Sequence, residues 1–145
     1  MPSIEDRKKR IISAFNSLNK DNLDVLDSFY DNSIEFTDPV TSVKGLPQAK
    51  KYYAHSYQNV ISIHFDFLQI NNEADLYFAK WNMHLQAKNL NPKKPFIVEG
   101  LSVLKFGSND KVISHRDYLD LGSLVYEKLP VLGAMIRRIK KTMQE

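Results

Sequence analysis

Residues 76–87 read Leu-Tyr-Phe-Ala-Lys-Trp-Asn-Met-His-Leu-Gln-Ala, with apolar and polar side chains in near alternation. Alternation with a period of two predicts a β-strand whose two faces differ in character. One face would present Tyr77, Ala79, Trp81, Met83 and Leu85, and the other Lys80, Asn82 and His84. Either face could line a cavity, and we expect a mixed lining that includes Trp81.

Three further strand-like runs surround this one, and polar connections separate all four. The other runs are residues 60–70, 95–106 and 111–119, and the connections are residues 71–75, 89–94 and 107–110. Connections of this length and chemistry join antiparallel strands. The four runs therefore predict one antiparallel meander.

Helical periodicity dominates on both sides of this sheet. Apolar residues recur at helical spacing in residues 4–18, in 23–30 and after Gly45-Leu46-Pro47, and a short strand over 34–37 stops at a proline. Residues 124–143 predict one or two closing helices, broken near Pro130 and Gly133. Helices followed by a strongly curved antiparallel sheet define an α+β fold. The helices would fill the concave side and leave a cone-shaped cavity at its open end, in one domain over residues 1–145.

Composition excludes several classes of site. The chain has 145 residues and no cysteine, which excludes disulfides, thiolate zinc sites and a cysteine nucleophile. Its four histidines are scattered and its five glycines stand singly, so we expect neither a metal nor a bound cofactor. The sequence shows no signal peptide and no membrane-spanning run, and we expect a cytoplasmic protein.

The formal net charge is +3, and the excess is concentrated near the two ends. Residues 7–10 read Arg-Lys-Lys-Arg, and residues 137–141 read Arg-Arg-Ile-Lys-Lys. Such clusters can contact nucleic acid or an anionic membrane. We interpret them as solvated faces of terminal helices and expect no nucleic-acid partner. The alternative is that the last helix is a membrane-surface or partner-binding device, with an apolar side of Leu129, Leu132, Met135, Ile136 and Ile139.

Two carboxylates beside bulky apolar residues mark candidate cavity positions. Asp38 follows Phe36-Thr37, and Asp117 lies in the run His-Arg-Asp-Tyr-Leu-Asp over residues 115–120. An ionised side chain is costly to bury without a partner, which favours a cavity at both places. His115 shares a strand face with Asp117, and this pair suits proton transfer. The alternatives are a turn in which Asp38 bonds its own backbone, and a strand end whose polar groups pair with one another.

The order of elements resembles the NTF2-like superfamily, which includes SnoaL-type polyketide cyclases, ketosteroid isomerases and limonene epoxide hydrolases. The resemblance covers nearly the whole chain. Its motifs are Asn22-Leu23-Asp24, Phe29-Tyr30-Asp31, Phe36-Thr37-Asp38-Pro39, Gly45 before Tyr52-Tyr53, residues 107–113 and residues 115–120. We expect a ligand pocket inside the cone, lined by Tyr30, Tyr53, Tyr57, Trp81, His84 and Ser102. The alternative for the three tyrosines is a core role with satisfied hydroxyl groups.

The resemblance implies acid–base chemistry, but the catalytic motifs match only in part. Asp38 falls where ketosteroid isomerases carry their general base, whereas the positions of their oxyanion hole hold Ala14 and Ser102. Losing such a donor removes a contribution of roughly 3 kcal/mol. Asp117 maps to a catalytic aspartate of limonene epoxide hydrolases, although no Arg-x-Asp pair occurs in residues 80–84. In cyclase-type members an aspartate works with a polar neighbour, and Asp117 with His115 could fill those roles.

We therefore predict a protein that binds a small hydrophobic molecule in a cone-shaped pocket. Cofactor-free isomerase, cyclase or hydratase activity, with Asp38, Asp117 and His115 as catalytic residues, is the first hypothesis. A non-catalytic ligand-binding or protein-interaction module is the second. Residues 97–104 are apolar on both strand faces, which predicts a homodimer through the sheet.

Overall fold

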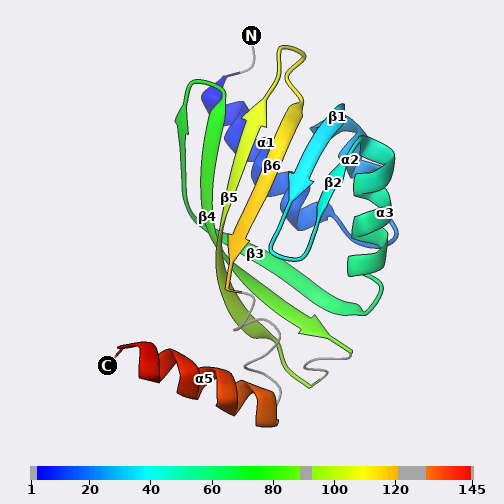
Figure 1. The fold of residues 1–145 in the computed structure, drawn as a ribbon. Helices are drawn as coiled ribbons and strands as arrows, with labels where there is room; N and C mark the ends of the chain where they lie inside the picture. Colours follow the sequence, from blue (N-terminus) through cyan, green and yellow to red (C-terminus); the bar gives the residue numbers. More distant parts are fainter. Residues whose placement is uncertain (1–2, 89–92, 121–129, 145) are drawn as a thin grey trace.

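The computed structural model describes residues 3–88, 93–120 and 130–144 (Figure 1). Its elements, in chain order, are α1 (Ile4–Ser17), α2 (Val25–Phe29), β1 (Tyr30–Thr37), β2 (Ser42–Lys44), α3 (Leu46–Ser56), β3 (Val60–Glu73), β4 (Leu76–Ala87), β5 (Phe96–Phe106), β6 (Val112–Leu119) and α5 (Pro130–Gln144). The prediction of an α+β fold is confirmed. Strand β2, which forms a short hairpin with β1, was not predicted.

The six strands form one curved sheet in the order β2-β1-β6-β5-β4-β3. Strands β3 to β6 make the predicted antiparallel meander. Strand β1 pairs with β6 in parallel, a pairing that was not predicted. The connection through β2 and α3 carries the chain to the far edge of the sheet. No hairpin therefore fixes the direction of β1 relative to β6.

Helix α1 fills the concave side of the sheet. Its Phe15 ring meets the rings of Phe65 and Phe67 edge-on, with centroids 5.2 and 5.4 Å away. Asn16 pairs with the backbone of Phe65, accepting from its N–H at 2.8 Å and donating to its carbonyl oxygen at 3.1 Å. This amide therefore covers part of the outer edge of β3, which is the last strand in the order of the sheet.

The basic side chains of residues 7–10 are not only solvated, because two of them form ion pairs with acidic residues in turns of the sheet. Arg7 Nε and Arg10 Nη1 each lie 2.8 Å from a carboxylate oxygen of Asp110, which precedes β6. Arg7 Nη1 also lies 2.8 Å from Asp75, in the β3–β4 connection. Half of the four basic side chains in residues 7–10 are thus ion-paired across the fold.

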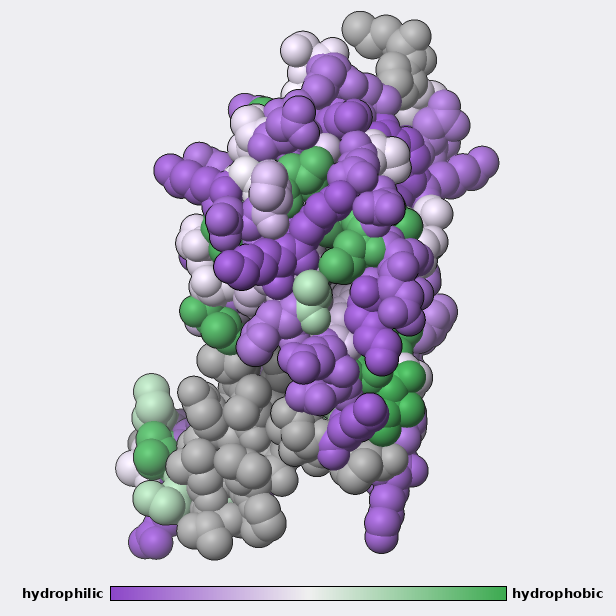
Figure 2. All heavy atoms as spheres, turned by 90° about the vertical axis from the view of Figure 1, so that its right-hand side faces the viewer, coloured by the Kyte–Doolittle hydropathy of each residue, from purple (hydrophilic) through white to green (hydrophobic). Residues whose placement is uncertain are grey.

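Strand β4 turns its apolar face into the cone. Trp81 lies at the centre of this face, directly opposite Gly100 of β5. A Cβ at Gly100 would lie 2.2 Å from the Trp81 ring, so only glycine lets the indole cross β5 at this point. The other buried residues of β4 are Tyr77, Ala79, Met83, Leu85 and Ala87. The side of the molecule next to α3 is mostly hydrophilic, with small separate hydrophobic patches (Figure 2).

Helix α5 begins at Pro130 and runs without interruption to Gln144. The break predicted at Pro130 is thus the start of the helix, which suits a proline, and the break predicted near Gly133 does not occur. The earlier part of the predicted closing segment lies outside the described residues. Figure 1 shows α5 at the lower end of the molecule, apart from the sheet. No helix in the described ranges is long and apolar enough to cross a membrane.

Candidate functional site

Two adjoining cavities lie between the helices and the concave face of the sheet. The inner one has a volume of about 40 Å³, and Ala14 and Tyr30 belong to its wall. The outer one has a volume of about 170 Å³, and Trp81 and Asp38 belong to its wall. Four residues line both cavities: Tyr53, Tyr57, Phe65 and Asp117. Both volumes are below the range of roughly 300–1,000 Å³ typical of ligand sites, so they fit a small or slender molecule.

Asp117 stands at the boundary of the two cavities, near the end of β6. Its Oδ1 accepts a hydrogen bond from Ser102 Oγ at 2.5 Å and contacts His115 Nε2 at 2.7 Å. Trp81 Nε1, which can only donate, supports Ser102 by a hydrogen bond of 2.9 Å to Oγ. Two donors therefore fix Asp117, and one of them is itself fixed by the central tryptophan.

The same chain of hydrogen bonds continues from His115 into the tyrosines. His115 Nδ1 lies 2.6 Å from the Tyr30 hydroxyl, which lies 3.0 Å from the Tyr53 hydroxyl. An imidazole that donates from Nε2 to a carboxylate accepts at Nδ1, so Tyr30 donates to His115. Burial raises the pKa of Tyr30 well above its ordinary value. The phenol thus keeps the proton that it donates.

Two polar groups in the cavity walls have no partner among the described residues. Asp117 uses Oδ1 for both of its hydrogen bonds, which leaves Oδ2 unpaired there. The hydroxyl of Tyr57 likewise has no hydrogen bond within the described ranges, although its ring packs edge-on against Tyr53. One available acceptor and one available donor thus lie in walls shared by both cavities.

Asp38 lies in the wall of the outer cavity, but both of its oxygens have partners. Oδ1 accepts from the backbone N–H of Val40 at 2.8 Å and of Thr41 at 2.9 Å. Oδ2 accepts from the hydroxyl of Tyr52. Asp38 therefore bonds the backbone of its own turn and also lines the cavity, so both interpretations of this residue hold. Sequence reasoning missed Tyr52, because the helical pattern of α3 does not show which of its neighbouring tyrosines meets the Asp38 turn.

His84 is the one predicted lining residue that the structure places elsewhere. It lies on the convex face of β4, because strand alternation sends it away from Trp81 and Met83. There its Nε2 lies 2.7 Å from Asp66 of β3. The structure brings the other predicted residues together on the concave side: Tyr30, Tyr53, Tyr57, Trp81, Ser102, His115 and Asp117. Ser102 and Trp81 support Asp117, and Asp38 belongs to the wall of the same outer cavity.

A metal site is not formed by these groups. Within the described ranges, no three His, Asp or Glu side chains are placed to hold a metal ion. The chemistry that the residues offer is that of proton transfer and hydrogen bonding.

A curved sheet wrapped around helices is the fold of the NTF2-like class of proteins. Within that class the chain belongs to the SnoaL-like domain family, whose model matches residues 11–115. A search of curated protein sequences found no significant match.

Solved structures show the same fold at low sequence identity. A candidate SnoaL-like polyketide cyclase from Shewanella putrefaciens has a TM-score of 0.70 at 18% identity, over 92% of this chain and 99% of that one. A second candidate cyclase, from Shewanella denitrificans, has a TM-score of 0.70 at 19% identity, over 81% and 93%. A hypothetical protein with a ketosteroid isomerase-like fold from Catenulispora acidiphila, in complex with trimethylamine, has a TM-score of 0.70 at 15% identity, over 83% of this chain and 90% of that one.

Proposed function

We propose that the protein binds a small hydrophobic carbonyl compound in the cone and catalyses cofactor-free acid–base chemistry on it. The observation that carries this proposal is the Asp117 carboxylate. Two donors hold Oδ1, while Oδ2 has no partner among the described residues and the side chain borders both cavities. A general base needs a fixed orientation and one free oxygen, and Asp117 combines both. Membership of the SnoaL-like family supports a ligand-binding, cyclase or isomerase role.

In the proposed reaction, Asp117 Oδ2 takes a proton from a carbon next to the carbonyl group. The electron pair of that C–H bond shifts toward the carbonyl oxygen and gives an enolate. The Tyr57 hydroxyl donates a hydrogen bond to this oxygen, as an oxyanion-hole donor does. Asp117 then returns the proton to another carbon of the conjugated system. This completes an isomerisation in which no atom is gained or lost.

His115 and Asp38 have supporting roles in this mechanism. His115 holds Oδ1 and is itself held by Tyr30, so it positions the carboxylate. Asp38 accepts three hydrogen bonds that occupy both of its oxygens, whereas Asp117 keeps one oxygen without a partner among the described residues. We therefore assign Asp38 to ligand contact at the rim of the outer cavity.

The test begins with the ligand itself. Native mass spectrometry of the purified protein, followed by solvent extraction, identifies any bound molecule. Carbonyl compounds of that class are then incubated with the protein in heavy water, and NMR follows the exchange of hydrogen next to the carbonyl. We expect exchange to fall roughly a thousandfold in Asp117→Asn. Asp66→Asn, which makes the same change on the convex face, should leave exchange unaltered.

Two outcomes would contradict the proposed enzyme. Exchange in Asp117→Asn at the wild-type rate would remove Asp117 from the mechanism. A tightly bound apolar molecule with no exchange in the wild-type protein would establish the second candidate, a non-catalytic binding module. The β4 side chains that line the outer cavity are the hydrophobic Trp81, Met83 and Leu85. They favour a ligand-binding module over a protein-interaction module.

We also propose a homodimer through the convex face of the sheet. Ile97 and Tyr118 are half-exposed there, and contact with a second copy would cover them. Sedimentation that shows only monomer at micromolar concentration would contradict the dimer.

A further inference from the structure

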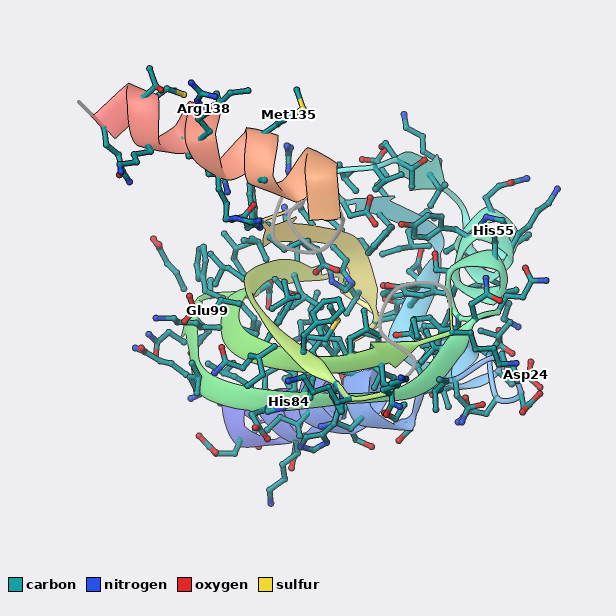
Figure 3. The ribbon with its side chains drawn as sticks, turned by 90° about the horizontal axis from the view of Figure 1, so that it is seen from below. Asp24, His55, His84, Glu99, Met135 and Arg138 are labelled. Atoms are coloured by element: carbon teal, nitrogen blue, oxygen red, sulfur yellow. The ribbon has the colours of Figure 1, made fainter. Side chains whose placement is uncertain are left out.

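Helix α5 presents an exposed row of apolar side chains. Met135, Ile139 and Met143 follow one another at four-residue spacing and therefore share one side of the helix. Their exposed fractions are 56%, 58% and 81%. Figure 3 shows Met135 and Arg138 projecting away from the cone. An apolar row this exposed does not belong to the core of its own chain, which argues against the interpretation of α5 as a simple closing helix.

The polar side of α5 is strongly basic. It holds Arg137, Arg138, Lys140 and Lys141, and residues 130–144 contain no acidic side chain. Lys140 lies 3.4 Å from Asp120, at the end of β6. The α5 helix thus contributes four positive charges and no negative charge of its own.

Helix α5 lies at the end of the molecule to which the outer cavity belongs. The wall of that cavity includes Leu119 at the end of β6, Ser56 at the end of α3 and Asp38 just after β1. These ends lie in the lower part of Figure 1, and α5 lies below them. Hydrophobic side chains are also visible at this lower end in Figure 2. Whatever α5 binds will therefore lie at the same end of the molecule as the outer cavity.

We propose that α5 is an interfacial helix that binds an anionic lipid surface. Its apolar row enters the boundary between headgroups and acyl chains, and its four cations lie at the level of the phosphates. Helices that lie in a membrane surface have this combination of a basic side and an apolar side. Each Lys or Arg near an anionic leaflet strengthens such binding. The proposal goes beyond the chemistry at Asp117 and does not depend on it.

Charge complementarity favours a lipid surface over a second copy of the chain. A second copy would offer α5 either its own α5, which carries the same four cations, or the convex face of its sheet. That face carries four exposed cations and four exposed carboxylates: Lys44, Lys80, Lys105 and Arg116 beside Glu35, Asp66, Glu73 and Glu99. A face without a net negative charge does not complement a helix with four cations and no acid. An anionic bilayer complements both sides of α5.

Co-sedimentation of the full chain with lipid vesicles tests the proposal. One set of vesicles contains phosphatidylcholine alone, and the other adds roughly one-third phosphatidylglycerol. We expect binding to the anionic set, little binding to the neutral set, and a loss of binding as salt rises. The double variant Arg138→Glu, Lys141→Glu should lower the affinity about tenfold or more. Ile139→Ser should also lower it, because it removes the centre of the apolar row.

The α1 cluster supplies a matched control. The double variant Lys8→Glu, Lys9→Glu makes the same change in net charge at another helix and should keep the wild-type affinity within about twofold. Three results would overturn the proposal: no binding to anionic vesicles at low salt, an equal loss in both double variants, or a protein dimer that Ile139→Ser dissociates. The substituted side chains are exposed or half-exposed, and circular dichroism checks that each variant is folded.

Discussion

Two histidine–aspartate contacts of nearly the same length lie on opposite faces of the sheet. On the concave face His115 Nε2 lies 2.7 Å from Asp117, and on the convex face His84 Nε2 lies 2.7 Å from Asp66. His64 Nε2 adds a second contact to Asp66 at 2.8 Å. The side chain of His115 is 2% exposed, whereas that of His64 is 62% exposed. Residue type and distance are matched, so only the surroundings differ.

The surroundings decide what each carboxylate can do. Each oxygen of Asp66 contacts one histidine, and the side chain faces water, which weakens both interactions. Asp117 places both hydrogen bonds on one oxygen and keeps the other beside an apolar cavity. Poor hydration strengthens electrostatic interactions at such a site. A search for His–Asp pairs alone would therefore rank the two faces equally, although only one of them offers a free base.

The largest difference is expected when each face loses its histidine. His115→Ala removes a partner from both Asp117 and Tyr30 and leaves a void, so we expect the free energy of unfolding to fall by about 3 kcal/mol. His84→Ala removes a partly exposed group and should change it by no more than about 0.5 kcal/mol. Urea denaturation of the two variants measures both values. Equal losses would show that burial does not separate the two pairs.

The next largest effect is expected where the concave face is most crowded. Gly100→Ala places a Cβ within 2.2 Å of the Trp81 ring, and we expect a loss of about 2 kcal/mol. Trp81 is the only tryptophan of the chain, so its fluorescence reports any movement of the ring directly. Glu99→Ala, at the neighbouring outward position of β5, provides the control. Unchanged fluorescence and stability in Gly100→Ala would show that the concave face accommodates the added methyl group with no loss of folding free energy.

The sequence predicts the meander well and the inner contacts less well. Alternation placed a strand over residues 76–87, and the structure has β4 over the same residues. The same alternation put His115 and Asp117 on one face, where they are in contact. The pairing of Asp117 with Ser102 could not be predicted by counting residues outward from the β5–β6 turn. Phe106 pairs with Val112 but Lys105 pairs with Ser114, so an irregularity shifts the register by one residue.

Long-range choices also lay beyond the sequence pattern. The parallel pairing of β1 with β6 depends on where α3 carries the chain, and no local signal records that path. The inward turn of Trp81 depends on the absence of a side chain at Gly100, which lies opposite it on another strand. Both features combine residues that are distant in sequence. A periodicity argument treats each strand separately and cannot include them.

A smaller effect is expected from the serine that links Trp81 to Asp117. Ser102→Ala leaves the buried Trp81 N–H without its acceptor and Asp117 with one donor fewer, so we expect a loss of about 1–2 kcal/mol. Ser114→Ala makes the same chemical change on the outward side of β6 and should be close to neutral. Urea midpoints of the two variants give the comparison. An unchanged urea midpoint in Ser102→Ala would indicate that Ser102 orients Trp81 and Asp117 but does not stabilise the fold.

The smallest effect is expected on the convex face and should depend on pH. Hydrogen bonds from His84, and then from His64, lower the pKa of Asp66 because they favour its ionised form. A lowered pKa stabilises the folded state above the ordinary aspartate pKa of about 3.9, and this contribution is lost as pH falls through the lowered value. Asp66→Asn should therefore lower the urea midpoint slightly near neutral pH and have no effect at about pH 2. The side chain is exposed, so even the neutral-pH shift should remain well below that of Ser102→Ala. A larger shift near neutral pH would show that the convex cluster is screened less than its exposure implies, and the contrast between the two faces would then depend on the free oxygen of Asp117 alone.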